Sequence, residues 1–325
     1  MVKAILVHSP GGPDVLVAKE IEVGDPGPNE VRLRQTAIGV NFIDTYHRSG
    51  LYPVPGLPFT PGMEAVGEID AVGDGVTDFR VGDRVCYGTG PLGSYSEARV
   101  MAPDSLVRVP PSISDETAAG MMLRGLTVWY LLRSLHTLSK GETVLFHAAA
   151  GGVGLIFSQW ANHIGATVIG TVGSEEKAEL ARSNGCHHTI LYKHEDFPAK
   201  VKEITNGAGV SVVYDGVGKD TFVGSLECLQ RRGLMVSFGN ASGPPPSLEV
   251  GSLGPRGSLF VTRPTLFDYT GTRTELDRGC GELFDVVCSG AVQIEVGQSY
   301  GLSQAHHAHA DLEAGITTGS TILVP

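Results

Sequence analysis

The sequence has few cysteines, few charges and no long apolar run, and each shortage argues against a class of protein. The five cysteines, Cys86, Cys186, Cys228, Cys280 and Cys288, are odd in number and include no Cys-x-x-Cys pair. A disulfide framework or a structural zinc site is therefore not expected. No apolar run approaches the ~20 residues of a transmembrane helix. The first residues, MVKAILVHSPGG, carry one lysine and a short apolar run, so we expect no signal peptide.

Positive charge is also scarce. The 325 residues contain 24 Lys and Arg against 35 Asp and Glu, a net charge of −11. This excess of acid argues against binding to nucleic acid or to an anionic membrane. Because 42% of the residues are hydrophobic, the chain can build a buried core, and its length suggests two domains. We expect a reduced, soluble, cytoplasmic protein.

The chain changes character near residue 125. Before this point, short strand-like segments alternate with Gly and Pro at regular spacing, which predicts an irregular β-rich domain. The expected strands are 30–40, 64–73, 82–88 and 95–101. Four prolines make 52–62 a loop, because proline sustains neither helix nor sheet pairing.

After residue 125 the pattern becomes strand, helix, strand. The expected strands are 142–149, 166–173, 188–192, 210–217, 233–239 and 257–263, and the expected helices are 151–165, 174–185, 194–206 and 219–231. Such alternation predicts an α/β domain with a doubly wound parallel sheet, covered by helices on both faces. From about residue 270 the chain returns to one helix and short strands.

The segment HAAAGGVG at 147–154 lies between an expected strand and an expected helix. The three glycines of the dinucleotide fingerprint fall on Ala149, Gly151 and Gly154, so alanine replaces the first. Gly151 would let the backbone approach a pyrophosphate, and Gly154 would let helix and strand pack closely. The segment predicts a dinucleotide site at the start of a helix.

The next strand ends in TVGS at 171–174, without the acid that usually binds the ribose of NAD. Gly173 leaves room for a 2′-phosphate, Ser174 offers donors and is the expected N-cap, and Lys177 lies one turn into the helix. Lys177 could instead be an ordinary solvated lysine. The missing acid nevertheless favours NADP(H) over NAD.

Four segments, 37–53, 125–132, 145–161 and 228–243, closely resemble the bacterial NADPH:quinone oxidoreductases. These form the zeta-crystallin-like, zinc-free branch of the medium-chain dehydrogenase/reductase superfamily. The resemblance runs along the whole chain. It implies a GroES-like catalytic domain of residues 1–125 and 265–325, and a Rossmann domain of residues 126–264. It also implies a homodimer formed through the edge strand 257–263.

The same resemblance implies NADPH as cofactor and assigns the residues that hold it. Those near the nicotinamide are Asn41, Phe42, Tyr46, Thr127 and Tyr130. Those at the pyrophosphate and the adenosine are Gly151, Gly152, Val153, Gly173, Ser174, Lys177 and Tyr192. The rest of the cleft is expected to contain Gly216, Val217, Phe238, Gly239, Asn240, Phe260, Thr262 and Arg263.

Zinc-dependent relatives carry metal ligands at the positions that hold Asn41 and Met63 in this sequence. An amide and a thioether are poor substitutes for thiolate and imidazole, so we expect no metal. His306, His307 and His309 are the remaining candidates, but no cysteine or acid completes a site. We interpret them as a solvated polar helix face.

A site without metal favours an acceptor whose reduced form is weakly basic. Reduction of a simple ketone gives an alkoxide, whereas reduction of a quinone gives a phenolate-like anion with a pKa near ~10. On a water-like alkoxide scale of ~15.7, the difference corresponds to ~8 kcal/mol of charge stabilisation that the protein need not supply. Candidate hydrogen-bond donors to this anion are Asn41, Tyr46 and Tyr52.

The sequence therefore predicts NADPH-dependent reduction of quinones by hydride transfer. Two alternatives remain open at this stage. The first is an NADPH-dependent alkenal/one reductase, which applies the same hydride chemistry to an activated C=C bond. The second is a non-enzymatic NADPH-binding protein, structural or RNA-associated.

Overall fold

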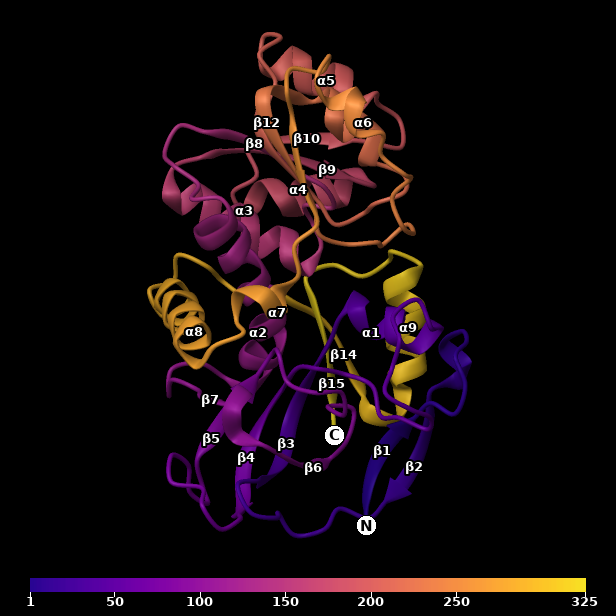
Figure 1. Ribbon diagram of the computed structural model, residues 1–325, viewed down its shortest axis with the longest axis vertical. Helices are drawn as coiled ribbons and strands as arrows, with labels where there is room; N and C mark the ends of the chain where they lie inside the picture. The colour runs from indigo at the N-terminus through magenta and orange to yellow at the C-terminus, as the bar shows by residue number, and fades with distance from the viewer. The chain divides into compact units, whose positions relative to one another are not determined.

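The computed structural model describes residues 1–325, which form two compact units (Figure 1). The first, the β-rich unit, comprises residues 1–127, 270–289 and 294–325. The second, the parallel-sheet unit, comprises residues 128–269 and 290–293. Helix α2 (Asp115–Trp129) runs through residue 125, where the sequence analysis places its domain boundary. No helix combines the length and the apolar character that crossing a membrane would require.

The β-rich unit is built on a seven-stranded sheet of order β14-β15-β3-β4-β5-β7, with β6 also paired to β3. Its strands are β3 (Val31–Val40), β4 (Ala65–Val72), β5 (Arg84–Tyr87), β6 (Ala98–Met101), β7 (Val107–Arg108), β14 (Val296–Gly301) and β15 (Ser320–Val324). A separate antiparallel pair is formed by β1 (Val2–Leu6) and β2 (Val17–Ile21). The helices are α1 (Phe42–Ser49), α2, α8 (Arg273–Cys288) and α9 (Ala305–Glu313). The strands predicted at 30–40, 64–73, 82–88 and 95–101 are confirmed, with shorter ends.

Strand β3 carries the chain into the centre of this unit. Its first half alternates, with Val31 and Leu33 buried and Arg34 exposed, as expected for a strand with one solvated face. The second half, from Ala37 to Val40, is buried on both faces. The chain then enters α1, so the residue between them, Asn41, lies in the interior at 5% exposure.

The parallel-sheet unit has six parallel strands in the order β10-β9-β8-β11-β12-β13. They are β8 (Thr143–Phe146), β9 (Thr167–Val172), β10 (His188–Leu191), β11 (Val210–Asp215), β12 (Leu229–Ser237) and β13 (Phe260–Thr262). The helices are α3 (Gly152–Ile164), α4 (Glu175–Ser183), α5 (Phe197–Ile204), α6 (Phe222–Glu227) and α7 (Leu266–Tyr269). This is the Rossmann strand order, whose direction of winding reverses between β8 and β11.

Successive strand residues face opposite layers of helices. Phe146 of β8 and Tyr214 of β11 pack on Phe157 of α3, with ring centroids 4.3 and 4.8 Å from that ring. Their neighbours Leu145 and Val213 belong to a hydrophobic cluster that also contains Phe222 and Leu226 of α6. Helices therefore cover both faces of the sheet, which confirms the predicted doubly wound α/β class.

Several local expectations need correction. The helix predicted at 219–231 ends at Glu227, and β12 begins at Leu229, so CLQRR starts a strand. A register shift in the pairing of β11 with β12 accommodates this early start. The sequence analysis also did not identify β1, β2, α1 and α2. After α2 the chain continues as a π-helical segment, Tyr130–Leu135.

Candidate functional site

The loop between β8 and α3 has the geometry of a dinucleotide-binding turn. Ala148 adopts the left-handed conformation with φ of +57°, and α3 then starts after its N-cap Gly151. No side chain caps this end of the helix, so its positive end can receive an anion. A Cβ atom on Gly154 would come within 2.6 Å of the carbonyl oxygens of Ala148 and Ala149. Glycine at 154 therefore allows the close approach of helix and strand that the fingerprint assigns to its third glycine.

Alanine at the first fingerprint position is compensated by a glycine on the neighbouring strand. Ala149 is fully buried, and its N–H donates to Thr171 O at 3.0 Å. A Cβ on Gly170 of β9 would lie 2.5 Å from the Ala149 methyl group. The methyl group thus occupies space that Gly170 leaves open.

Two lysines meet where β9 and β10 end. Leu191 pairs with Val172, so the residues that follow these strands are neighbours. A Cβ on Gly173 would lie 3.5 to 3.8 Å from Lys193 Cε and Nζ and from Tyr192 Cε1. Burial and the charge of Lys193 together lower the pKa of Lys177. Such a pair of like charges beside a glycine suits a phosphate dianion.

The predicted N-cap of α4 is confirmed. Ser174 Oγ accepts the N–H of Lys177 at 3.4 Å. Glu175 and Glu176 are exposed in the first turn, where carboxylates are favoured by the helix dipole. Neither is buried beside Gly173, so the strand tip has the donor-rich character expected for NADP(H).

Most predicted cofactor residues of this unit follow the carboxyl ends of strands. Gly173 and Ser174 follow β9, Tyr192 follows β10, Gly216 and Val217 follow β11, Phe238, Gly239 and Asn240 follow β12, and Arg263 follows β13. Ligands of open α/β sheets bind at this edge, near the point where the strand order reverses. Thr262 and Phe260 lie within β13, and Phe260 is 60% exposed on that edge strand.

Asp215 shapes the loop after β11. Its buried Oδ1 accepts the N–H groups of Val217 and Gly218 at 2.8 and 2.9 Å. A Cβ on Gly239 would lie 2.4 Å from Gly216 O, so the loops after β11 and β12 touch through their backbones. Arg263 Nη1 donates to the carbonyls of Ser237 and Gly239, which fixes the end of β12.

Tyr130 is buried at the start of the π-helical segment. It is 2% exposed and stacks on Tyr269, with ring centroids 4.7 Å apart. Burial and the neighbouring Tyr269 hydroxyl raise its pKa. Local π-helical geometry is often found at functional sites.

In the β-rich unit the predicted nicotinamide residues cluster on and beside α1. Phe42 and Tyr46 lie one turn apart with ring centroids 6.4 Å apart, and Tyr52 meets Tyr46 edge-on at 5.1 Å. Thr127 lies on α2, and its hydroxyl donates to Leu123 O at 2.7 Å. The structure therefore brings Phe42, Tyr46 and Tyr52 together directly after Asn41.

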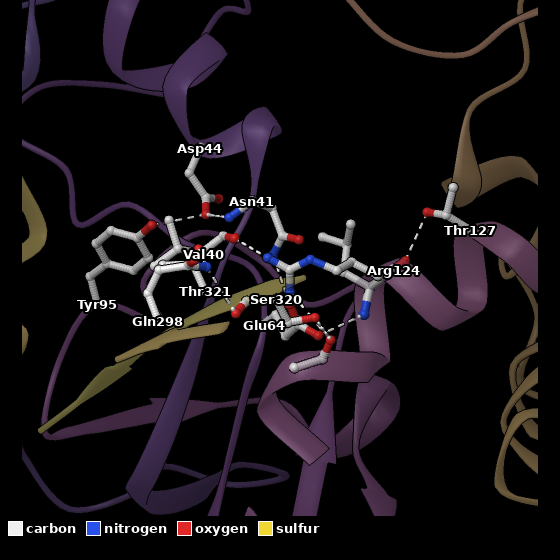
Figure 2. A network of polar contacts seen from close by, with 12 residues as sticks. Val40, Asn41, Asp44, Glu64, Tyr95, Arg124, Thr127, Gln298, Ser320 and Thr321 are labelled. Atoms are coloured by element: carbon white, nitrogen blue, oxygen red, sulfur yellow. Dashed lines mark hydrogen bonds and ion pairs between the residues drawn. The ribbon is translucent and has the colours of Figure 1, made fainter. Parts of the chain in front are cut away.

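Asn41 is the end of a buried charged network (Figure 2). Its Nδ2 donates to Glu64 Oε2 at 2.7 Å, and the carboxylate also accepts Leu123 N–H at 2.9 Å. Arg124 Nη1 lies 3.4 Å from Glu64 Oε2, and Arg124 Nη2 donates to the carbonyl of Val40. Burial raises the pKa of Glu64, and the charge of Arg124 opposes that shift.

A second buried chain starts at Asp44 on α1. Asp44 Oδ2 accepts Asn41 N–H at 2.8 Å and the Tyr95 hydroxyl at 3.0 Å. Tyr95 in turn lies 2.9 Å from His309 Nε2, and Arg48 donates to His309 Nδ1 at 3.1 Å. Because arginine only donates, His309 is neutral with its proton on Nε2. Burial raises the pKa of Asp44 to about 7.

The positions of the missing zinc ligands are filled by buried residues. Asn41 binds Glu64, and Met63 is 8% exposed. The structure contains no group of three or more His, Cys, Asp or Glu side chains that could hold a metal ion.

The interpretation of the three histidines of α9 as a solvated face is wrong for His309. His309 is fully buried between Tyr95 and Arg48. The rings of His306 and His307 lie 4.0 Å apart. The sequence spacing correctly indicates a helix but not which side of it faces the core.

Sequence reasoning missed five charged residues that build the site: Asp44, Glu64, Arg124, Lys193 and Asp215. Lys193 had a usable signal, because it follows the second strand after the fingerprint, and the parallel pairing of that strand with β9 brings it to Gly173. Arg124 had none, since its partner Glu64 is 60 residues away in the chain.

Two family descriptions match the chain. Residues 152–274 match "Zinc-binding dehydrogenase", and residues 27–111 match "Alcohol dehydrogenase GroES-like domain". The first description names zinc, although the ligand positions of this chain hold Asn41 and Met63. The two matches correspond to the parallel-sheet unit and the β-rich unit.

Full-length relatives narrow the family. The chain is 54% identical over 325 residues to the quinone oxidoreductase of Pseudomonas aeruginosa, with all of both chains covered. It is 50% identical to a 2-haloacrylate reductase of a Burkholderia species, with 100% of this chain and 99% of the relative covered. The crystal structure of Escherichia coli quinone oxidoreductase complexed with NADPH matches with a TM-score of 0.98, at 49% identity, over 99% of this chain and 100% of that one. The chain therefore belongs to the quinone oxidoreductase family of the medium-chain dehydrogenase/reductase superfamily.

Proposed function

We propose that this protein is an NADPH-dependent quinone oxidoreductase that transfers hydride without a metal ion. The observation that carries the proposal is the pairing of a donor-rich strand tip, Gly173 with Lys177 and Lys193, with full-length likeness to quinone oxidoreductases. The strand tip suits the 2′-phosphate that distinguishes NADPH from NADH. The likeness supports the choice of acceptor.

The cofactor fits the residues that are present. The uncapped start of α3 after Gly151 can receive the pyrophosphate, and the Gly173 corner leaves room for a 2′-phosphate beside the ammonium group of Lys193. NADPH, when bound, supplies the hydride. We propose that Gly151, Gly152 and Val153 hold the pyrophosphate and that Gly173, Ser174, Lys177 and Tyr192 hold the adenosine phosphate.

We propose that the remaining predicted residues contact the nicotinamide half of NADPH. They are Asn41, Phe42, Tyr46, Thr127, Tyr130, Gly216, Val217, Phe238, Gly239, Asn240, Phe260, Thr262 and Arg263. Most follow strand ends or lie near α1.

The acceptor chemistry requires only modest help from side chains. A reduced quinone is phenolate-like, so hydrogen bonds suffice to stabilise the charge that develops. Tyr46 and Tyr52 are proposed as donors, because they stack edge-on beside Asn41 on an aromatic surface that suits a flat ring. Asn41 is proposed as the third polar group.

We further propose a cytoplasmic homodimer formed through residues 257–263. Strand β13 is the end of the six-stranded sheet, with β12 as its neighbour, and Phe260 on it is 60% exposed. An open edge strand with an exposed aromatic side chain is a ready surface for a second copy. Sedimentation velocity at several concentrations tests this, and a monomer throughout would refute it.

The alternatives predict different behaviour. The likeness to a 2-haloacrylate reductase makes activated alkenes a useful comparison. With purified protein and NADPH, steady-state rates should be highest for quinones, lower for alkenals and 2-haloacrylates. Faster turnover of an alkene would favour the reductase of activated C=C bonds. Binding of NADPH without turnover of any acceptor would favour a non-enzymatic role.

A further inference from the structure

Asn41 is fixed from three sides by charged groups. Its backbone N–H donates to Asp44, its side-chain Nδ2 donates to Glu64, and the preceding carbonyl, of Val40, accepts from Arg124. Figure 2 shows these groups converging on the short junction between β3 and α1.

The fold alone does not require this arrangement. Glu64 is 0% exposed and Arg124 is 5% exposed, and such a buried ion pair seldom adds stability over apolar residues of the same size. The backbone also makes room for it, because a Cβ on Gly39 would lie 2.0 Å from Glu64 Oε2. The buried ion pair is costly, and the surrounding backbone accommodates it. Because the one side-chain amide that Glu64 binds is that of Asn41, the pair points to a role for this amide.

The carboxylate determines which way the Asn41 amide faces. Oε1 of Glu64 accepts the N–H of Leu123 and Oε2 faces Arg124 Nη1, so both oxygens of the carboxyl group already face donors. Only Nδ2 can face such a group. The amide oxygen and the second N–H are therefore held in one orientation, which an uncharged partner would not impose.

We propose that Glu64 is a positioning residue, which orients the Asn41 amide for the nicotinamide half of the cofactor while Arg124 supplies its counter-charge. This rests on the proposed function, since it takes NADPH as the ligand. It adds that the carboxylate acts only through Asn41.

A double-mutant cycle tests this through binding alone. NADPH and adenosine 2′,5′-bisphosphate, which lacks the nicotinamide half, are titrated into wild type, Asn41→Ala, Glu64→Gln and the double variant. Each single change should weaken NADPH binding by about 5- to 10-fold, the effect of one hydrogen bond. Within the Asn41→Ala background, Glu64→Gln should add less than about 2-fold, because its route to the ligand is gone. Binding of the bisphosphate should stay within about 2-fold throughout.

A matched control is Glu68→Gln, an exposed glutamate on the same strand, β4, which should leave both ligands unaffected. If Glu64→Gln alone does not fold, Glu64→Gln combined with Arg124→Met removes both charges and replaces it in the cycle. Independent, multiplying effects of the two changes on NADPH binding would overturn the proposal, as would an equal loss for the bisphosphate. Quinone turnover is measured separately: its absence alongside a coupled cycle would refute the proposed function and leave this assignment standing.

Discussion

At the scale of single residues, Lys177 and Lys193 should determine the choice of cofactor. One charge-assisted contact to a phosphate contributes roughly 1.5–3 kcal/mol, so Lys177→Ala should weaken NADPH binding by about 10- to 150-fold. Lys193 is exposed, and its replacement by alanine should cost less, about 3- to 10-fold. NADH lacks the 2′-phosphate, so its affinity should hardly change.

Titration of both cofactors into wild type and the two lysine variants measures this preference. Lys140→Ala, an exposed lysine before β8, serves as the control for loss of charge. Equal losses for NADPH and NADH, or a wild type that prefers NADH, would contradict the assignment.

Tyr46 should assist the reaction without being essential. We expect Tyr46→Phe to lower kcat/KM for a quinone by about 10-fold or less, because a phenolate-like product needs only part of the stabilisation that one hydrogen bond can give. Steady-state kinetics with a fixed quinone measure the effect. A 10⁴-fold loss, which corresponds to roughly 5 kcal/mol, would show that Tyr46 is an obligatory acid.

Asp44 should make the stability of the protein depend on pH near neutrality. Its folded pKa, about 7, lies above the ~3.9 of an unfolded aspartate. The folded state therefore binds the proton more tightly, and the free energy of unfolding should fall as pH rises from about 4 to about 7, by at most ~4 kcal/mol.

Urea denaturation of wild type and Asp44→Asn between pH 4 and pH 8 isolates this contribution. The variant should lose stability less steeply than wild type as pH rises. Identical slopes would show that Asp44 titrates at an ordinary pKa.

How much of the site is predictable depends on how far apart its residues lie in the chain. Gly151, Gly154 and Gly173 follow from a local motif, and their surroundings in the structure fit the roles that the motif gives them. The pairing of Glu64 with Arg124 joins residues 60 positions apart, and no pattern within either segment reveals it. Polar groups in a core are specified by tertiary contacts, which a single sequence does not display.

At the scale of elements, the junction of β8 with α3 should tolerate no side chain at Gly154. A Cβ there would meet backbone oxygens at 2.6 Å, and backbone cannot move aside as a flexible side chain can. We expect Gly154→Ala to destabilise the protein by about 1–3 kcal/mol and to weaken NADPH binding. Thermal and urea denaturation with a cofactor titration measure both effects.

Gly281→Ala is the matched control. This glycine lies in α8, where an added Cβ would meet nothing within 4 Å. Alanine should be neutral or stabilising there by up to ~1 kcal/mol, because it favours the helix. Similar destabilisation at both positions would show that the junction is not specially crowded.

The elements themselves were predicted best where apolar runs are long and bounded by glycine. The core strands β8, β9 and β11 fall within their predicted ranges, since a buried parallel strand is apolar along its whole length. Helix α2 was not predicted, because it is buried nearly all round and shows no polar face to mark its period. Strand β12 starts early, at Leu229, because this residue pairs with Val210 of β11. The polar residues that follow, Gln230, Arg231 and Arg232, give no sign of a buried strand in the sequence.

At the scale of the whole molecule, activity should not depend on metal. Asn41 and Met63 stand where zinc ligands would be, and the reduced quinone does not need a Lewis acid. We expect elemental analysis of active protein to find less than stoichiometric zinc, and treatment with a chelator to leave turnover unchanged. Stoichiometric zinc whose removal abolishes activity would contradict the prediction.

Strand β15 lies between β14 and β3 in the sheet of the β-rich unit, yet it follows the whole parallel-sheet segment in the chain. During synthesis, β3 is therefore made long before β15, which pairs with residues 38–40 of β3. Residues 128–269 are continuous and can fold during that interval, while the backbone groups of residues 38–40 still lack their β15 partners. The parallel-sheet unit should consequently complete its folding before the β-rich unit, although synthesis of the β-rich unit begins first. The buried surroundings of Asn41 should be among the last parts of the molecule to form.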